Sequence, residues 1–495
     1  MTPPRCGQIQ RYAAPISAAE RANRAGGVLK HIGIGLDFGT SNSAAAWFDG
    51  QQLHRVYIEN GSPILPTAIH LDRQFAALTG NAAIAQYVEE NRGRRVELVA
   101  EVIGESASSV TGNQTGEDIS RLDTQRHTLY GPLYDRTLPG RLFLGLKRLL
   151  GDPDIERLSV FERQYRLVAL LTPILLRIHD ELARTLGSAL PGIHAGRPVT
   201  FEGRTGNRNQ VALQRLTEAY EHAGFRVAEF YPEPVAATLS WLQGARRLDR
   251  GIALTVDFGG GTLDLAAVRF EGERFEVLAT HGMALGGDRI DQLIFEQMLF
   301  PELGKGERWV REVDGRTIDT LFPFHEFEAG LVNWQTTFLL NQNQTRAMVV
   351  DRIARGGPGI EKFQRLLDLI SFNYSHNCFQ AIRRAKVALS TQTSTEIDIP
   401  ELNLTVPFSR AQLDAILAPV LARTRECVDT VLAHALITPA EVGIVIRTGG
   451  TSQIVAVREL LEELFPEKVE GHDPFTSVAC GLAIANWQGQ QYWLD

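Results

Sequence analysis

Two nearly identical segments constrain the fold of this 495-residue chain more than any other feature. The first runs from Ile34 to Asn42 and contains Asp-Phe-Gly-Thr-Ser; the second runs from Thr255 to Asp264 and contains Asp-Phe-Gly-Gly-Gly-Thr. In each segment an apolar, β-branched run precedes the aspartate, and a second strand-like run follows the glycine and hydroxyl residues. This pattern predicts two β-hairpins whose tight turns expose backbone N–H groups to an anion.

Each predicted hairpin places a carboxylate at the end of its first strand, Asp37 in one and Asp257 in the other, 220 positions apart (257 minus 37). A carboxylate beside a phosphate is repulsive unless a cation lies between them, so the pair predicts a hydrated Mg²⁺ with a phosphate ligand. An isolated Asp-x-Gly is more often a turn aspartate that bonds to its own loop. Two segments with the same Asp-Phe-Gly sequence favour duplicated lobes that bind one nucleotide between them.

Composition and charge argue against several classes of protein. The net charge of −8 and the lack of a long basic run are unlike a nucleic-acid-binding surface. The N-terminus lacks the apolar core of a signal peptide, and the longest apolar stretch, Leu167–Leu176, is about half of what a membrane span needs. The four cysteines lie far apart, as expected for thiols in a reducing compartment. We therefore predict a cytoplasmic protein with neither a nucleic-acid nor a membrane partner.

The chain is too long for one core and fits two large lobes or three to four smaller units. Residues 1–30 are polar without clear periodicity and are predicted to be a disordered leader, and residues 88–135 a surface excursion. Helices are predicted at about 78–87, 160–186, 210–223 and 477–486, and a buried strand at 443–450. Phe327, Leu331, Trp334 and Phe338 recur at helical spacing, which predicts the core of a small inserted subdomain, with a partner surface as the minority alternative.

Five motifs occur in an order typical of the actin-like ATPases. They are Asp37-Phe-Gly-Thr-Ser, Glu233-Pro-Val-Ala-Ala, the segment from Asp257 to Asp264, Leu285-Gly-Gly-Asp288 and Thr448-Gly-Gly-Thr-Ser452. The set most resembles the nucleotide-binding domain of the seventy-kilodalton heat-shock chaperones. Three more segments resemble that family's lysine-arginine segment, adenosine-contacting helix and closing helix: Lys147–Gly151, Arg384–Ser390 and Val478–Ala483. The sequence of Gly196–Glu202 and the insertion after Asp291 resemble those of the YegD-type chaperones of bacteria.

The resemblance implies an α/β fold of two actin-like lobes, each of ribonuclease-H-like topology, with the nucleotide in the cleft between them. Lobe I would comprise residues 31–247 and 472–495. Lobe II would comprise residues 248–471, including an inserted helical subdomain at about 292–395. The implied ligands are ATP or ADP with Mg²⁺, and the hinge between the lobes would be the moving part.

The resemblance also implies roles for individual residues. The catalytic carboxylates would be Asp37, Glu233, Asp257 and Asp264, and Asp37 and Asp257 would hold Mg²⁺ through its waters. The β- and γ-phosphates would lie against Gly39, Thr40, Ser41, Gly259, Gly260, Gly261 and Thr262. The α-phosphate, ribose and adenosine would lie against Gly286, Gly287, Lys386, Ser390, Gly449 and Gly450.

Departures from the family pattern bear on hydrolysis. The resemblance implies a lysine that contacts the γ-phosphate at the end of the segment that reads Gly80-Asn-Ala-Ala-Ile84 here, so that Ile84 replaces it. An arginine of 92–95, or Lys147, is left as an alternative source of positive charge. Arg383 and Val387 stand where a glutamate and a stacking arginine are implied, and loss of the cation–π contact costs about 1 kcal/mol. We therefore expect weakened ATP binding with slow or absent hydrolysis.

Three functional hypotheses follow. The leading one is an ATP-binding, weakly hydrolysing heat-shock-like protein whose lobe closure is recognised by a partner protein. This chain is expected to lack the β-sandwich with which the chaperones bind unfolded peptide. The second is a small-molecule kinase of the sugar-kinase type, which shares the lobes and the phosphate loops but needs a carboxylate base facing an acceptor pocket. The third is an actin-type filament or scaffold protein, although insertions at 88–135 and 292–370 make regular stacking harder.

Overall fold

The computed structural model describes residues 10–11, 31–109, 124–135, 137–187, 189–203, 206–244, 249–272 and 274–490. The chain divides into two compact units, each described by itself below. The first unit takes in residues 1–89, 140–301 and 377–495, and the second takes in residues 90–139 and 302–376.

The first sheet of the first unit combines an antiparallel meander with two parallel strands. The meander consists of β2 (Gly33–Phe38), β3 (Asn42–Phe48) and β4 (Leu53–Arg55), and β5 (Ile64–Pro66) also pairs with β3. On the other side of β2 lie the parallel strands β13 (Ile193–Arg197) and β14 (Val227–Pro232). The resulting order is β14-β13-β2-β3-β4, and β2 and β13 are buried almost throughout because both faces of the sheet are covered.

The second sheet repeats this plan. Its meander consists of β15 (Arg250–Phe258), β16 (Leu263–Glu271) and β17 (Arg274–Met283), followed on the other side of β15 by the parallel strands β22 (Ile444–Thr448) and β23 (Val469–Gly471). The order β17-β16-β15-β22-β23 therefore matches β4-β3-β2-β13-β14 strand for strand. This duplication confirms the predicted α/β fold with two related halves.

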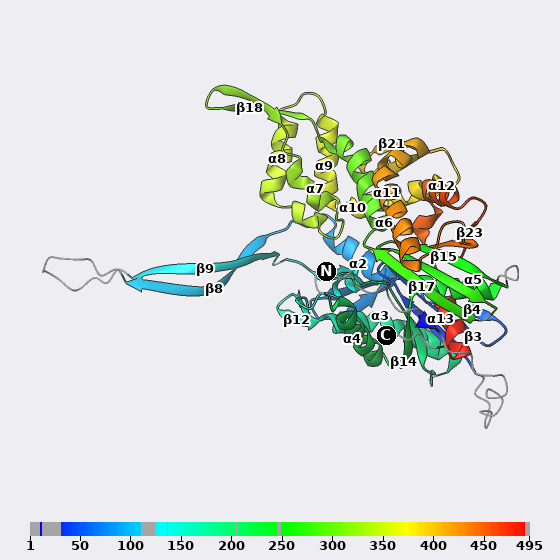
Figure 1. Cartoon of the computed structure of the whole chain (residues 1–495). Coiled ribbons are helices and arrows are strands. Elements are labelled where there is room, and N and C mark those ends of the chain that lie inside the picture. The colour runs from blue at the N-terminus through cyan, green and yellow to red at the C-terminus, as the bar shows by residue number, and fades with distance from the viewer. Residues whose placement is uncertain are drawn as a thin grey trace, which may run out of the picture. The chain divides into compact units, whose positions relative to one another are not determined.

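Two helices, α5 (Glu233–Gly244) and α13 (Ser477–Gln488), pack against each other and against strands of both sheets (Figure 1). Small residues permit this crossing, since a Cβ on Gly481 of α13 would lie 1.7 Å from the carbonyl oxygen of Ala236 in α5. Their apolar side chains form one core with strands of the second sheet, including Val235, Ala253 and Leu482. The two halves of the first unit thus share the packing of these two helices.

The remaining elements of the first unit surround the two sheets. Around the first sheet lie β6 (Ala68–Asp72), β7 (Ala77–Thr79), α2 (Gly80–Asn91), β10 (Gly140–Leu144), η1 (Leu146–Leu149), β11 (Arg157–Val160), β12 (Arg163–Arg166), α3 (Leu167–Leu186) and α4 (Arg208–His222). The second half of the chain adds α6 (Gly287–Ile294), η2 (Phe295–Leu299), η3 (Phe300–Leu303), α10 (Ser375–Ala388), β20 (Ser394–Ile399), η5 (Pro400–Leu402), β21 (Leu404–Ser409), α11 (Arg410–Ala435), η6 (Gly450–Gln453) and α12 (Val455–Leu464). No helix among the described residues has the length and apolar character needed to cross a bilayer.

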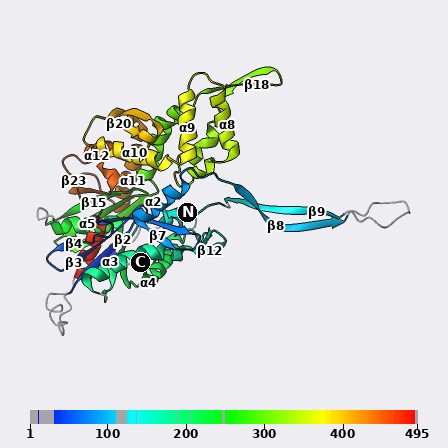
Figure 2. The same cartoon turned by 180° about the vertical axis from the view of Figure 1, so that it is seen from behind.

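The second unit joins two segments that lie far apart in the sequence. One segment forms a long two-stranded ribbon of β8 (Leu98–Ser109) and β9 (Thr124–Asp135) (Figure 2). The other forms β18 (Arg308–Val313), β19 (Arg316–Leu321), α7 (His325–Leu331), η4 (Thr337–Leu340), α8 (Asn343–Ala354) and α9 (Ile360–Phe372). Asn341 links the segments, because its side-chain amide donates to the carbonyl of Arg94 at 2.6 Å and its own carbonyl accepts from the Val96 N–H at 3.0 Å.

Several predicted elements differ from the observed ones. The predicted helix at 160–186 begins only at Leu167, because residues 157–166 form the β11–β12 hairpin. The segment 88–135 contains the β8–β9 ribbon rather than loops alone. The stripe of Phe327, Leu331, Trp334 and Phe338 is buried, which confirms it as core, although α7 ends at Leu331.

Two of the predicted domain segments are described by the structure in part. Most of the predicted leader, 1–30, lies outside the described residues; within it, Gln10–Arg11 form strand β1, antiparallel to β17. The inserted segment that groups apart from the sheets is 302–376, shorter than the predicted 292–395.

Candidate functional site

Four carboxylates gather where the central strands of the two sheets end. Asp37 and Asp257 stand one residue before the ends of β2 and β15, and Asp264 of β16 lies directly opposite Asp257 in the antiparallel register. Glu233 is the first residue of α5. Asp264 and Glu233 are buried, and Asp37 and Asp257 are partly buried. The structure therefore brings together all four predicted catalytic residues.

Lys147 brings a positive charge into this cluster. It belongs to η1, its side chain is 4% exposed, and its Nζ donates a hydrogen bond to Oε1 of Glu233. Burial lowers the pKa of Lys147, but the charges of Glu233 and Asp37 outweigh burial, so that the pKa is raised overall. The ammonium is held in its charged form among acids.

The structure places Lys147 in this cluster. Ile84 lies on α2 and supplies no charge, but the cluster does contain an ammonium, from one of the alternative sources left open by the sequence. The expectation of slow or absent hydrolysis stays a prediction.

The acids themselves are strongly perturbed. Burial, followed by the charge of Glu233, raises the pKa of Asp37 to about 7 and that of Asp264 to about 7, and also raises the pKa of Asp257 well above its usual value. Oδ1 of Asp37 is buried and has no hydrogen-bond partner among the described residues, whereas Oδ1 of Asp264 accepts from the Val199 N–H at 3.1 Å. When ionised, four carboxylates that face one ammonium carry an excess of negative charge, which a bound cation would neutralise.

The two hairpin turns touch each other through glycines. The second turn is closed by a hydrogen bond from the Gly259 N–H to the Thr262 carbonyl at 3.0 Å. A Cβ on Gly260 would lie 2.6 Å from Oγ of Ser41, and a Cβ on Gly261 would lie 3.0 Å from Cγ2 of Thr40. These turns therefore need glycine for close approach, and they bring the side chains of Thr40 and Ser41 beside Gly260 and Gly261.

Two further glycine segments border the second turn. The Gly287 N–H and the Thr451 hydroxyl both donate to the carbonyl of Gly259, at 3.1 and 2.8 Å. Gly449 has a φ of +79°, and a Cβ there would lie 2.7 Å from Oδ1 of Asp257. The predicted ribose and α-phosphate glycines, Gly286, Gly287, Gly449 and Gly450, thus belong to segments that contact the predicted phosphate turn.

A charged network beside the turns includes Arg148 and Asp288, which are not among the predicted site residues. Nη2 of Arg148 and Oγ of Ser41 both donate to Oδ2 of Asp288, at 3.1 and 3.5 Å. Nζ of Lys386 donates to Oδ1 of Asp291 at 2.5 Å. Arg148 directly follows Lys147, and Asp288 directly follows Gly287, so adjacency to these residues is the sequence signal that could identify both.

Of the two residues on α10 that were predicted to contact adenosine, one lies near the glycine segments and the other does not. Lys386 lies near the glycine segments, with its Nζ 3.6 Å from the position of a Cβ on Gly287. The hydroxyl of Ser390 instead donates to the carbonyl of Val387 at 2.6 Å, and no contact of Ser390 with the turns is described. Arg383 pairs with Asp291 at 3.0 Å, and Val387 is 70% exposed.

Comparisons with known proteins agree with this geometry. The family model of the Hsp70 protein matches residues 209–311 and 373–487. Chaperone protein dnaK of Emiliania huxleyi is 24% identical over 91% of this chain and 59% of its own length, and chaperone protein HscA of Edwardsiella ictaluri is 24% identical over 92% and 58%. The mitochondrial heat shock protein SSC3 of Saccharomyces cerevisiae is 23% identical over 91% and 57%. The chain thus spans less than two thirds of the length of these relatives.

Proposed function

The chain belongs to the Hsp70 family, and from this premise we propose that it binds ATP with Mg²⁺ between its two phosphate turns and hydrolyses it. The observation that carries the proposal is the buried Lys147–Glu233 pair beside Asp37, next to two glycine turns in mutual contact. Removing an ion pair from water costs free energy, and such buried charges cluster at functional sites. Here both partners adjoin a predicted phosphate site.

The carboxylates fit a hydrated magnesium ion. The buried, unpartnered Oδ1 of Asp37 offers an acceptor for a metal-bound water, and Asp257 would offer another from the opposite hairpin. Bound Mg²⁺ supplies neutralisation of the phosphate charge and polarisation of a phosphate oxygen. Asp264 accepts a hydrogen bond from the Val199 N–H and lies opposite Asp257 on the neighbouring strand. It would therefore influence the ion through its charge rather than as a direct ligand.

The residues of the chain would position the phosphates and the water that attacks. The hydroxyls of Thr40, Ser41 and Thr262 and the N–H groups of the turns would donate to phosphate oxygens, and the Lys147 ammonium would stabilise negative charge at the γ-phosphate. Glu233 accepts a hydrogen bond from Lys147 and fixes the direction of its ammonium. Phosphoryl transfer needs chiefly such positioning and charge neutralisation.

We also propose that nucleotide binding is coupled to movement of the two halves and to recognition of a protein partner, as in a chaperone. Ser41 and Arg148 from the first half hold Asp288 from the second, so that a phosphate entering between the turns must displace these contacts. Their rearrangement would report the nucleotide state to the surface.

Steady-state ATP turnover with Mg²⁺ tests the proposal. The wild-type chain should release phosphate, and Asp37→Asn and Asp257→Asn should each lower the rate about 100-fold or more, because each removes a charge that positions the ion. Asp398→Asn is a matched control, because Asp398 on β20 accepts only a local bond from Thr405. Absence of turnover in all proteins, or ADP release only after a sugar is added, would contradict it.

A further inference from the structure

An exposed aromatic ring lies beside one of the glycine segments of the site. Phe475, which precedes α13, is 49% exposed. A Cβ on Gly450 would lie 3.2 Å from Cε1 and 3.5 Å from Cζ of this ring, so the ring packs against the bare backbone of Gly450. Single exposed apolar side chains are common on protein surfaces, so the position of this one, and not its exposure, is informative.

Gly450 stands between two residues that contact the phosphate turn. Gly449 approaches Asp257, and the Thr451 hydroxyl donates to the carbonyl of Gly259. The ring of Phe475 is therefore separated from the predicted phosphate site only by the width of this glycine segment.

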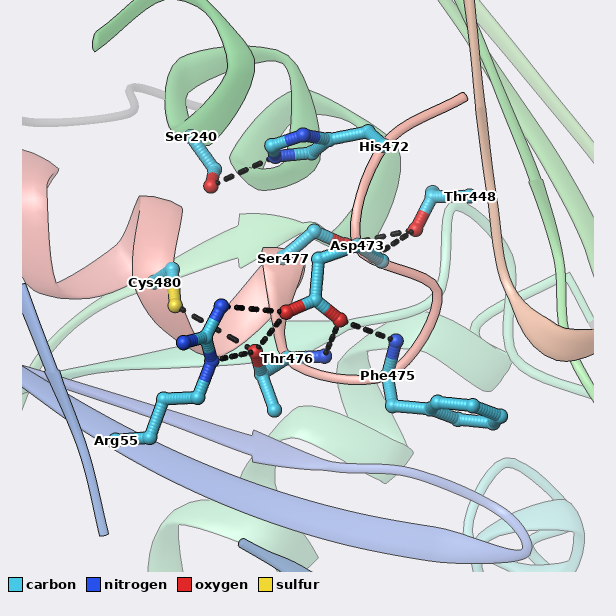
Figure 3. Close-up of polar contacts among 9 residues, drawn as sticks. All are labelled: Arg55, Ser240, Thr448, His472, Asp473, Phe475, Thr476, Ser477 and Cys480. Carbon is cyan, nitrogen blue, oxygen red and sulfur yellow. Dashed lines mark hydrogen bonds and ion pairs between the residues drawn. The ribbon is translucent and has the colours of Figure 1, made fainter. Parts of the chain in front are cut away.

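The loop that carries Phe475 is firmly held. The carboxylate of Asp473 accepts from the Phe475 N–H at 2.9 Å, the Thr476 N–H at 3.0 Å and Nη2 of Arg55 at 2.8 Å (Figure 3). The Thr448 hydroxyl, at the end of β22, donates to the Asp473 carbonyl at 2.8 Å and so ties the loop to the strand that leads into Gly449. Figure 3 shows the phenyl ring pointing away from this polar cluster.

The Lys386 side chain lies near the other end of the same segment. The position of a Cβ on Gly287 lies 2.7 Å from Oγ1 of Thr451 and 3.6 Å from Nζ of Lys386. The Phe475 ring is therefore the apolar group beside Gly450, while an ammonium lies near Thr451. An exposed aromatic face suits the flat, weakly hydrated face of a nucleobase better than it suits a sugar or a phosphate.

We propose that Phe475 stacks on the base of the bound nucleotide and is the aromatic determinant of purine binding in this chain. The inference rests on the proposed function, since it requires the phosphates to occupy the glycine turns. Stacking on an aromatic side chain recognises the face common to purines, so adenine and guanine nucleotides would both use this contact.

The test is the affinity for ATP of three variants of Phe475, measured by calorimetry with Mg²⁺. Phe475→Ala should weaken binding about 5- to 150-fold, the range measured for loss of base–aromatic stacking. Phe475→Tyr, which keeps the ring, should bind like the wild type. Phe475→Leu, which keeps apolar bulk without a ring, should remain weakened about fivefold or more. Phe372→Ala, an exposed phenylalanine of α9, is the matched control and should change nothing.

A purely structural role for Phe475 predicts a different result. If the ring only caps the start of α13, Phe475→Leu should bind ATP as tightly as the wild type, and that result would overturn the inference. Equal affinity of wild type and Phe475→Ala would also overturn it while leaving the proposed function intact. A wild-type chain that binds no nucleotide would instead refute the proposed function on which the inference rests.

Discussion

The ammonium of Lys147 and the carboxylate of Glu233, 86 residues apart in the sequence, form an ion pair nearly closed off from solvent. Such a pair contributes little to net stability, because desolvation of two charges offsets most of their attraction. Both partners also lie near Asp37, whose pKa they shift in opposite directions. The arrangement is therefore better explained by a ligand that uses these charges than by a contribution to folding.

Replacement of Lys147 should separate folding from catalysis. Lys147→Met leaves Glu233 buried without its partner, so unfolding in urea should show a loss of about 3–5 kcal/mol, together with loss of ATP turnover. The double variant Lys147→Met/Glu233→Gln removes both charges and should recover most of the stability but none of the turnover. Phosphate release at the wild-type rate by either protein would contradict a role for Lys147.

The acidic cluster should make the ligand-free protein less stable as the pH rises. The pKa of Asp37 is about 7 in the folded protein and 3.8 as its ordinary value, so between these pH values the folded state binds a proton that the unfolded state has released. The free energy of unfolding of the wild type, relative to Asp37→Asn, should therefore fall from about pH 4 through pH 7. Urea unfolding of both proteins across this range measures the difference, and a constant difference would contradict it.

Binding of Mg²⁺ and ATP should release protons near neutral pH. The cation favours ionised carboxylates, whereas Asp37 and Asp264, each with a pKa of about 7, are partly protonated before binding. Calorimetry in buffers of different ionisation enthalpy should detect proton release at pH 7, with fewer protons released by Asp37→Asn. Affinity should increase from pH 6 to pH 8, and a pH-independent affinity without proton release would count against the cluster as the cation site.

Gly449 should be far more sensitive to substitution than a glycine of similar conformation elsewhere. A Cβ at Gly449, with φ +79°, would lie 2.3 Å from the Phe258 carbonyl oxygen, so Gly449→Ala should cost more than about 1 kcal/mol and weaken ATP binding. Gly61 has φ +82° and nothing within 4 Å of its Cβ position, so Gly61→Ala isolates the backbone strain. Thermal unfolding and ATP titration of both variants make the comparison, and equal effects would contradict a packing role for Gly449.

Asp473 should stabilise the loop before α13 in a pH-dependent way. Burial raises its pKa, but hydrogen bonds from Thr476, Phe475 and Arg55 outweigh burial and lower the pKa to about 2. The stabilisation is therefore present above about pH 4 and is lost as the pH falls through 2. Asp473→Ala should cost about 1–2 kcal/mol at pH 7 and much less at pH 2. A cost independent of pH would show that the charge of Asp473 contributes nothing.

Local sequence patterns were sufficient to predict the hairpins and the residues they present. Asp37 and Asp257 follow apolar runs and precede glycine turns, and these local features determine where each strand ends. The β11–β12 hairpin was missed because its residues continue without a break into the apolar pattern of α3, starting at Leu167. The β8–β9 ribbon was missed because its polar composition resembles that of a loop.

Which charged residues pair with one another could not be predicted from the sequence. Whether Lys147 points into the cluster depends on the turn of η1 and on packing against α5, which begins with Glu233 far along the chain. The pairing of Arg383 with Asp291 likewise joins α10 to α6 across the inserted segment. Contacts of this kind are set by tertiary structure, and no local pattern specifies them.

A calorimetric titration of ATP into the 495-residue chain tests the central claim most directly. The account predicts saturable binding in the micromolar range with Mg²⁺, with strong loss of affinity when the ion is chelated with EDTA and in Asp257→Asn. Absence of binding to the folded wild-type protein would contradict it. Equal affinity in the presence of Mg²⁺, in EDTA and in Asp257→Asn would also show that the nucleotide does not use this site.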